Sequence, residues 1–151
     1  MIIIKMEPVK KRSKHICLEK IFDINNENYE VGIDEAGRGP LFGRVYAAAV
    51  VLPKDDENFH YEWMKDSKKF SSIKKINEVA DYIKQNAISW SVTYEDETTI
   101  DKINILQATY KCMHKAITNI LHDNCSISCL LVDGNNFKPF TQWNNEQSKY
   151  I

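Results

Sequence analysis

The stretch "VGIDEAGRGPLFGRVYAAAVV", residues 31–51, decides the fold expected for the rest of the chain. It starts as an apolar strand that runs into two adjacent acids, Asp34 and Glu35, and it ends as a second apolar strand that Pro53 closes. Only the short segment "RGPLFG" separates the two strands, and this is too short for the crossover helix that parallel neighbours need. The two strands are therefore predicted to pair antiparallel.

Two helices and two further strands are predicted downstream. The segment 71–86, "SSIKKINEVADYIKQN", has an apolar helical face and a serine N-cap at its start. The segment 87–96 alternates like a strand, and 98–121 has the broad apolar stripe of one long helix. "SISCLLVDGNNF", residues 126–137, reads as a buried strand that ends at Asp133. A strand–helix–strand unit of this kind indicates a parallel pair, so we expect an α/β domain with a mixed sheet.

The hydrophobic pattern, net charge and cysteine spacing limit the domain organisation and the kinds of site that we expect. Residues 1–29 show no clear hydrophobic period, so an N-terminal extension is expected there and one domain over 30–151. The net charge is −1, which means that any site for a polyanion must be a local basic patch. The four cysteines show no CxxC pair and no zinc-like spacing. No apolar run approaches the ~20 residues of a membrane span. At the N-terminus the charges follow the apolar residues, whereas in a secretory signal they precede them. We expect a cytoplasmic monomer that makes no membrane contact.

The acids are the first candidate for chemistry. If the last predicted strand lies beside the first, Asp133 comes close to Asp34 and Glu35, and the three carboxylates repel one another. Mg²⁺ or Mn²⁺ removes this conflict, since no histidine or cysteine nearby offers a softer ligand. Carboxylate-held metal pairs are common in enzymes that cut phosphodiesters. The alternative is that Asp133 only caps a strand end in an Asp–Gly turn while Glu35 faces solvent.

The residues around the acids are of types that bind phosphate groups. Gly37 and Gly39 flank Arg38, so the backbone there can approach a ligand closely and the guanidinium can meet a phosphate. Lys68 starts a basic run that continues to Lys75. This run fits a grip on a nucleic-acid backbone, and it equally fits a solvated helix end.

Four segments resemble the ribonuclease HII family, in family order, from about residue 31 to 140. "GIDEAGRGPLFGRVYAAAVVL" resembles its G-I-D-E-A-G-R-G-P signature and alanine-rich strand, and "DSKKFS" (66–71) resembles its D-S-K-K-L-S segment. "INILQATYKCMHKAI" is similar to its N-I-L-Q-A-T helix, and "LLVDGNNFKPF" to its V-D-G-N strand end. On the matched helix, Asn104 and Gln107 are expected to be structural hydrogen-bonding residues near the site.

The resemblance implies an RNase H-like fold and a metal-dependent endonuclease. Such enzymes cut the RNA strand of RNA–DNA hybrids, and they cut on the 5′ side of ribonucleotides embedded in duplex DNA, leaving 3′-hydroxyl and 5′-phosphate ends. Carried over position by position, Asp34, Glu35 and Asp133 are the catalytic acids and the ligands of Mg²⁺ or Mn²⁺.

The resemblance also implies the contacts to the nucleic acid. The backbone of the turn Gly37–Arg38–Gly39 is expected to read the ribose 2′-hydroxyl, which is the group that marks RNA. Ser67 and Lys68 are expected to contact the nucleic-acid backbone.

The family pattern extends further than this sequence. After V-D-G-N it continues with a strand end that bears a fourth aspartate, then a helix, then a tyrosine that stacks on a sugar, whereas the sequence stops at Ile151 within the connector "KPFTQWNNEQSKYI". Glu146 is the only acid after Asp133, and no predicted strand positions it. The expected domain is therefore an incomplete, C-terminally truncated RNase H-like domain with exposed apolar surface on its sheet and on the helix at 99–122. Its turnover is expected to be far slower than that of a complete family member.

Two other functions stay open. A non-catalytic fragment that binds RNA–DNA hybrids would keep the Gly37–Arg38–Gly39 turn and would bind without metal. A receiver-like domain would use acids at strand ends to hold Mg²⁺ for phosphorylation. Receivers alternate strand and helix from the start, and the short link between the first two strands here argues against that reading.

Overall fold

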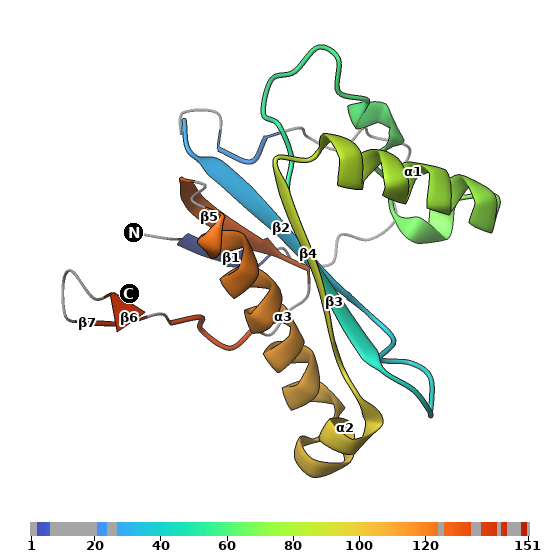
Figure 1. The fold of residues 1–151 in the computed structure, drawn as a ribbon, viewed down its shortest axis with the longest axis vertical. Helices are drawn as coiled ribbons and strands as arrows, with labels where there is room; N and C mark the ends of the chain where they lie inside the picture. The colour runs from blue at the N-terminus through green and yellow to red at the C-terminus, as the bar shows by residue number, and fades with distance from the viewer. Residues whose placement is uncertain are drawn as a thin grey trace.

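The computed structural model describes residues 3–6, 21–23, 27–123, 126–133, 137–141, 143–144 and 149–150. Its main feature is a five-stranded mixed sheet in the order β1-β5-β2-β3-β4, with the long helix α3 lying across one face (Figure 1). The strands are β1 (Ile3–Met6), β2 (Tyr29–Ala36), β3 (Val45–Val51), β4 (Ser89–Glu95) and β5 (Ile127–Val132).

The pairing of the strands confirms the mixed sheet expected from the sequence. β2 pairs antiparallel with β3, and β3 pairs antiparallel with β4. β5 returns beside β2 and runs parallel to it, as the strand–helix–strand unit predicts.

Three short strands of the described residues were not anticipated. β1 lies in the segment expected as an extension, and it pairs parallel with β5 from Ile3 opposite Cys129 to Met6 opposite Val132. β6 (Trp143–Asn144) and β7 (Lys149–Tyr150) form a separate antiparallel pair in the segment expected as a connector.

The helices follow the predicted pattern with one difference. α1 (Ile73–Asn86) begins after Ser72, whose hydroxyl oxygen accepts a hydrogen bond from the backbone N–H of Lys75 at 3.2 Å. The single helix predicted over 98–121 is wrong, because the structure has α2 (Glu97–Ile103) and α3 (Ile105–His122) instead.

Asn104 separates these two helices. Its φ of +66° and ψ of 163° lie far outside the helical region, so the helix cannot continue through this residue. Its side chain then caps α3 by accepting from the backbone N–H of Gln107 at 3.1 Å. The expectation that Asn104 is a structural hydrogen-bonding residue is confirmed.

The core lies between α3 and the sheet. Residues on one side of α3 and the alternating inward side chains of β2, β3 and β5 are buried together. The largest fully buried apolar side chains are Ile117, Ile120, Leu130, Val31, Val45 and Val51. Burying each of these stabilises the fold by about 1.5–3 kcal/mol, so this shared core fixes α3 on the sheet. No helix among the described residues is long and apolar enough to span a membrane.

The opposite face of the sheet is open. The register places Tyr46 opposite Tyr94 and Ala48 opposite Val92, and the exposed fractions are 40% for Tyr46, 49% for Tyr94 and 55% for Val92. The Tyr46 and Tyr94 rings contact each other at a centroid distance of 5.8 Å. The sheet therefore carries the exposed apolar surface that the sequence predicts.

Candidate active site

Asp34 lies within β2, beside the point where the parallel neighbour β5 ends and Asp133 follows it. Ile33 of β2 is opposite Val132 of β5, and the backbone N–H of Asp133 donates to the carbonyl oxygen of Ile33 at 3.0 Å. Ile33 and Val132 are buried under α3, whereas the residues that follow them, Asp34 and Asp133, are exposed. The fold thus brings together the two acids that are 99 positions apart in the sequence.

The electrostatics around Asp34 reflect this proximity. Neighbouring atoms remove part of the water from its carboxyl, and this desolvation raises the pKa of Asp34 above its ordinary value. The charges of Asp133, Glu35 and Asp66 raise the pKa further. A hydrogen bond from the backbone N–H of Glu35, 2.7 Å long, opposes these effects without cancelling them. The balance makes the ionised carboxylate of Asp34 less favourable than that of an ordinary aspartate.

Glu35 is turned toward a different partner. Its Oε1 accepts a hydrogen bond from the Arg38 guanidinium at 2.8 Å, and the two side chains form an ion pair. Across the part of the chain that the structure describes, no three His, Cys, Asp or Glu side chains are grouped so that they could hold a metal ion. The oxygen donors of Asp34 and Asp133 fit a hard cation such as Mg²⁺ or Mn²⁺, whereas Oε1 of Glu35 is engaged by Arg38.

The turn after β2 needs glycine at one position and leaves open space at another. Gly37 has a φ of +94°, and a Cβ there would lie 2.5 Å from the carbonyl oxygen of Arg44. At Gly39, no heavy atom of the described residues lies within 4 Å of the Cβ position. Gly37 therefore shapes the turn, while the backbone at Gly39 is accessible to a ligand.

The D-S-K segment lies near the acids. Ser67–Lys69 form a short 3₁₀ turn, and the Asp66 side chain accepts from the backbone N–H of Lys68 at 2.9 Å. Asp66 therefore stabilises this turn. Its charge also raises the pKa of Asp34, so Asp66 lies close enough to Asp34 for the two charges to interact. Ser67 and Lys68, which directly follow Asp66, are exposed.

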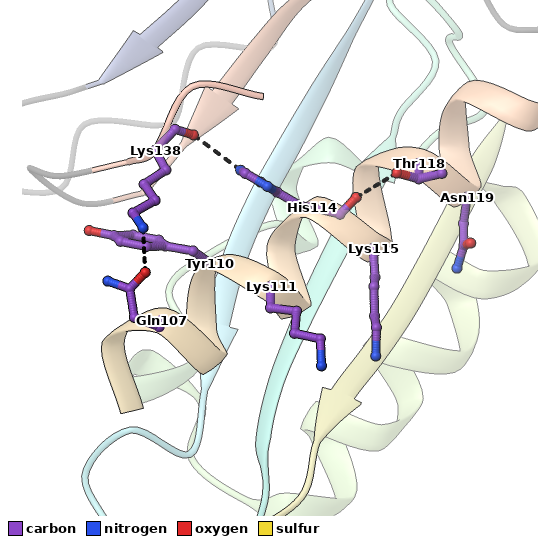
Figure 2. Close-up of a pocket in the computed structure, with 8 residues that line it drawn as sticks. All are labelled: Gln107, Tyr110, Lys111, His114, Lys115, Thr118, Asn119 and Lys138. Atoms are coloured by element: carbon purple, nitrogen blue, oxygen red, sulfur yellow. Dashed lines mark hydrogen bonds between the residues drawn. The ribbon is translucent and has the colours of Figure 1, made fainter. Parts of the chain in front are cut away.

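A hollow of about 500 Å³ on the outer side of α3 contains none of the expected site residues (Figure 2). The Lys138 carbonyl oxygen lies 3.1 Å from His114 Nε2, and the Lys138 ammonium donates to Gln107 Oε1, as Gln107 was expected to make structural hydrogen bonds. Lys111 and Lys115 of the same wall extend toward β4 and form ion pairs with Glu95. The polar groups of this hollow therefore serve the packing of α3.

Glu95 is the buried acid of the described core, with an exposed fraction of 4%. Burial alone would raise its pKa, but hydrogen bonds from Lys115 and Lys111 outweigh burial and lower the pKa of the carboxyl below its ordinary value. The ion pairs join the end of β4 to α3 and keep Glu95 charged.

Comparison with known proteins identifies the family. The model of the ribonuclease HII family matches residues 31–150. The chain belongs to the ribonuclease HII family. The protein named ribonuclease HII from Bacteroides fragilis is 44% identical over 117 residues, which are 78% of this chain and 55% of that protein. The ribonuclease HII of Oceanobacillus iheyensis is 44% identical over 114 residues, covering 74% of this chain and 42% of the relative.

Other relatives agree with this assignment. The ribonuclease HII of Janthinobacterium sp. is 42% identical over 127 residues, covering 84% of this chain and 56% of the relative. The chain thus spans about half the length of the curated relatives that it matches.

The fold agrees with that of a solved structure. A crystal structure of a mutant of Bst-RNase HIII superposes with a TM-score of 0.52 at 18% sequence identity, covering 74% of this chain and 38% of that one. The predictions of ribonuclease HII membership and of an RNase H-like mixed sheet with flanking helices are both confirmed.

Proposed function

We propose that the chain is a divalent-metal-dependent endoribonuclease of the HII type. Its substrates are the RNA strand of RNA–DNA hybrids and duplex DNA with embedded ribonucleotides, which it cuts on the 5′ side of the ribonucleotide. The observation that carries this proposal is the proximity of Asp34, on β2, to Asp133, directly after β5, with the pKa of Asp34 raised. Membership of the ribonuclease HII family supports it.

In this proposal the acids have distinct tasks. Asp34 and Asp133 hold Mg²⁺ or Mn²⁺, which when bound supplies an activated water and stabilises the leaving oxygen. Glu35 completes the ligand set after Arg38 releases it. Because Arg38 is part of the turn and its guanidinium pairs with Glu35, a substrate phosphate competes with Glu35 for that guanidinium.

The substrate contacts come from the two loops beside the acids. The backbone of Gly37, Arg38 and Gly39 approaches the ribose 2′-hydroxyl, and the open space at Gly39 leaves room for it. Ser67 and Lys68 are exposed and contact the phosphates through a hydroxyl and an ammonium.

The test is a nicking assay on two labelled duplexes that differ by one 2′-hydroxyl. We expect cleavage 5′ of the ribonucleotide in Mg²⁺ or Mn²⁺, with 3′-hydroxyl and 5′-phosphate ends, and no cleavage of the all-DNA duplex or in EDTA. Asp34→Asn and Asp133→Asn should each abolish it. A chain that neither nicks nor prefers the ribonucleotide duplex would show that the proposal is wrong.

A second candidate function is a non-catalytic fragment that binds RNA–DNA hybrids. It is favoured by the ion pair of Glu35 with Arg38 and by the absence of a three-carboxylate group among the described residues. It predicts hybrid binding that persists in EDTA and tolerates Asp133→Asn, with no nicking in either metal. Metal-dependent nicking that Asp133→Asn abolishes would exclude it.

A further inference from the structure

The tip of the loop between β2 and β3 carries two large apolar side chains that are not part of the hydrophobic core. Leu41 is 94% exposed and Phe42 is 92% exposed, the highest values among the exposed large hydrophobic side chains of the described residues. The loop projects from the end of the sheet in Figure 1, away from the core under α3. Because neither side chain is buried, neither contributes a hydrophobic term to the stability of the fold.

Positive charge flanks this apolar tip. Arg38 precedes it and Arg44 follows it, and the Arg44 guanidinium lies over the Tyr94 ring at 4.4 Å from its centroid. Gly43 has a φ of +105°, a conformation that L side chains rarely adopt, so the chain turns back directly after Phe42. An apolar tip between two guanidinium groups is complementary to a polyanion that has apolar surface between its phosphates.

We propose that Leu41 and Phe42 form an apolar wedge that enters the minor groove of the substrate duplex beside the ribonucleotide. This inference rests on the proposed function. The 2′-hydroxyl of an A-form strand is displayed in the minor groove, so a loop whose Gly37–Gly39 turn reads that group faces this groove. Leu41 follows Gly39 by two residues and therefore reaches the same groove.

The wedge has a definite physical effect on the duplex. Apolar side chains inserted in a minor groove separate the two bases of a step and partly unstack them. Here Arg38 and Arg44 contact the phosphates on the two sides of the groove, and the apolar pair between them contacts sugars and base edges. The tip thus adds affinity at the ribonucleotide without any hydrogen bond to a base.

Equilibrium binding in EDTA tests the wedge with the full chain, since no cleavage occurs without metal. The probe is a duplex with one ribonucleotide and 2-aminopurine in the adjacent step. The wild type is expected to raise the 2-aminopurine emission on binding. Leu41→Ser and Phe42→Ser should each weaken binding by about 5- to 100-fold, the range found when an aromatic contact to a base is removed, and should abolish the rise in emission.

Two controls separate the wedge from other roles. Phe42→Tyr keeps the ring and should bind like the wild type, and the serine variants should keep the wild-type melting temperature because both side chains are exposed. The slope of log affinity against log salt should be unchanged in the serine variants, since no charge is removed, and should decrease in Arg44→Ala.

Serine variants that bind within twofold of the wild type, or that alter only self-association in sedimentation, would overturn the wedge. Failure of the proposed function is distinguishable from this result. In that case the wild type itself binds the ribonucleotide duplex no better than the all-DNA duplex.

Discussion

Replacing Gly37 by alanine should separate the shape of the turn after β2 from its contact with substrate. A methyl group at Gly37 would lie 2.5 Å from the Arg44 carbonyl oxygen and 3.4 Å from the Val45 Cα. Both atoms are backbone at the start of β3, so they cannot rotate away as a side-chain end could. The substitution must therefore either distort the hairpin or change the backbone conformation of the turn.

The cost follows from two effects. Holding a non-glycine residue at a φ of +94° costs about 1–3 kcal/mol, and forcing an extra methyl into a close contact costs about 1–3 kcal/mol more. Together they reach about 2–6 kcal/mol, a large fraction of the about 5–15 kcal/mol that stabilises a typical domain. For a chain of this length we expect a decrease in melting temperature of about 4–24 °C.

Gly39→Ala is the matched control. A Cβ at Gly39 meets no described heavy atom within 4 Å, so this variant should keep the wild-type stability within about 0.5 kcal/mol. The measurement is urea unfolding followed by far-ultraviolet circular dichroism, with binding to the ribonucleotide duplex in EDTA. Gly39→Ala should lose the preference for that duplex over all-DNA while it remains folded. Equal stability of the two variants would refute the steric argument.

Three further predictions concern charged groups. Glu95→Gln should lower the free energy of unfolding at pH 7 by about 1–3 kcal/mol. The folded pKa of Glu95 is depressed, so the stability that Glu95 contributes is present above its unfolded pKa and is lost as the pH falls through its folded pKa. In unfolding measured over a series of pH values, the difference in stability between the wild type and the variant should therefore vanish in acid. Asp34→Asn should change stability in the opposite direction. Because the folded pKa of Asp34 is raised, the wild type loses stability as the pH rises past the unfolded pKa, and the metal-free variant should melt at a higher temperature than the wild type at pH 7. Mn²⁺ should raise the melting temperature of the wild type only. Arg38→Ala should bind Mn²⁺ about two- to fivefold more tightly, as seen by electron paramagnetic resonance of the free ion, because the exposed pair with Glu35 is worth at most about 1 kcal/mol. Arg44→Ala removes the same charge from the same loop and should bind Mn²⁺ with the affinity of the wild type. An equal gain in Mn²⁺ affinity in both variants would contradict a specific role of the pair between Arg38 and Glu35.

Local patterns were sufficient to predict most of the fold. The short link between the first two strands dictated an antiparallel pair, and the apolar run before Asp133 indicated a strand buried beside the first. A serine N-cap, at Ser71 or Ser72, was predictable because two serines precede an apolar helical face, and the structure has Ser72 in that role.

Features that depend on distant contacts or on one unusual torsion were not predictable. β1 has only four residues, and its place beside β5 is set by a partner more than 120 positions away. The break at Asn104 interrupts an apolar stripe that continues through it, so the periodicity gave no sign of the left-handed φ. The proximity of Asp34 and Asp133 followed from strand order, whereas the engagement of Glu35 by Arg38 depends on side-chain rotamers that a sequence pattern does not encode.

The position of β1 bears on the tendency of the sheet to associate with other molecules. β5, the strand that leads into Asp133, is bordered by β2 on one side and by β1 on the other. Because β1 occupies the outer backbone groups of β5, that strand is not open to pairing with a strand of a second molecule, which is how exposed sheet edges promote aggregation. Loss of the β1 pairing should therefore be seen as faster amide exchange in β5 and as increased aggregation.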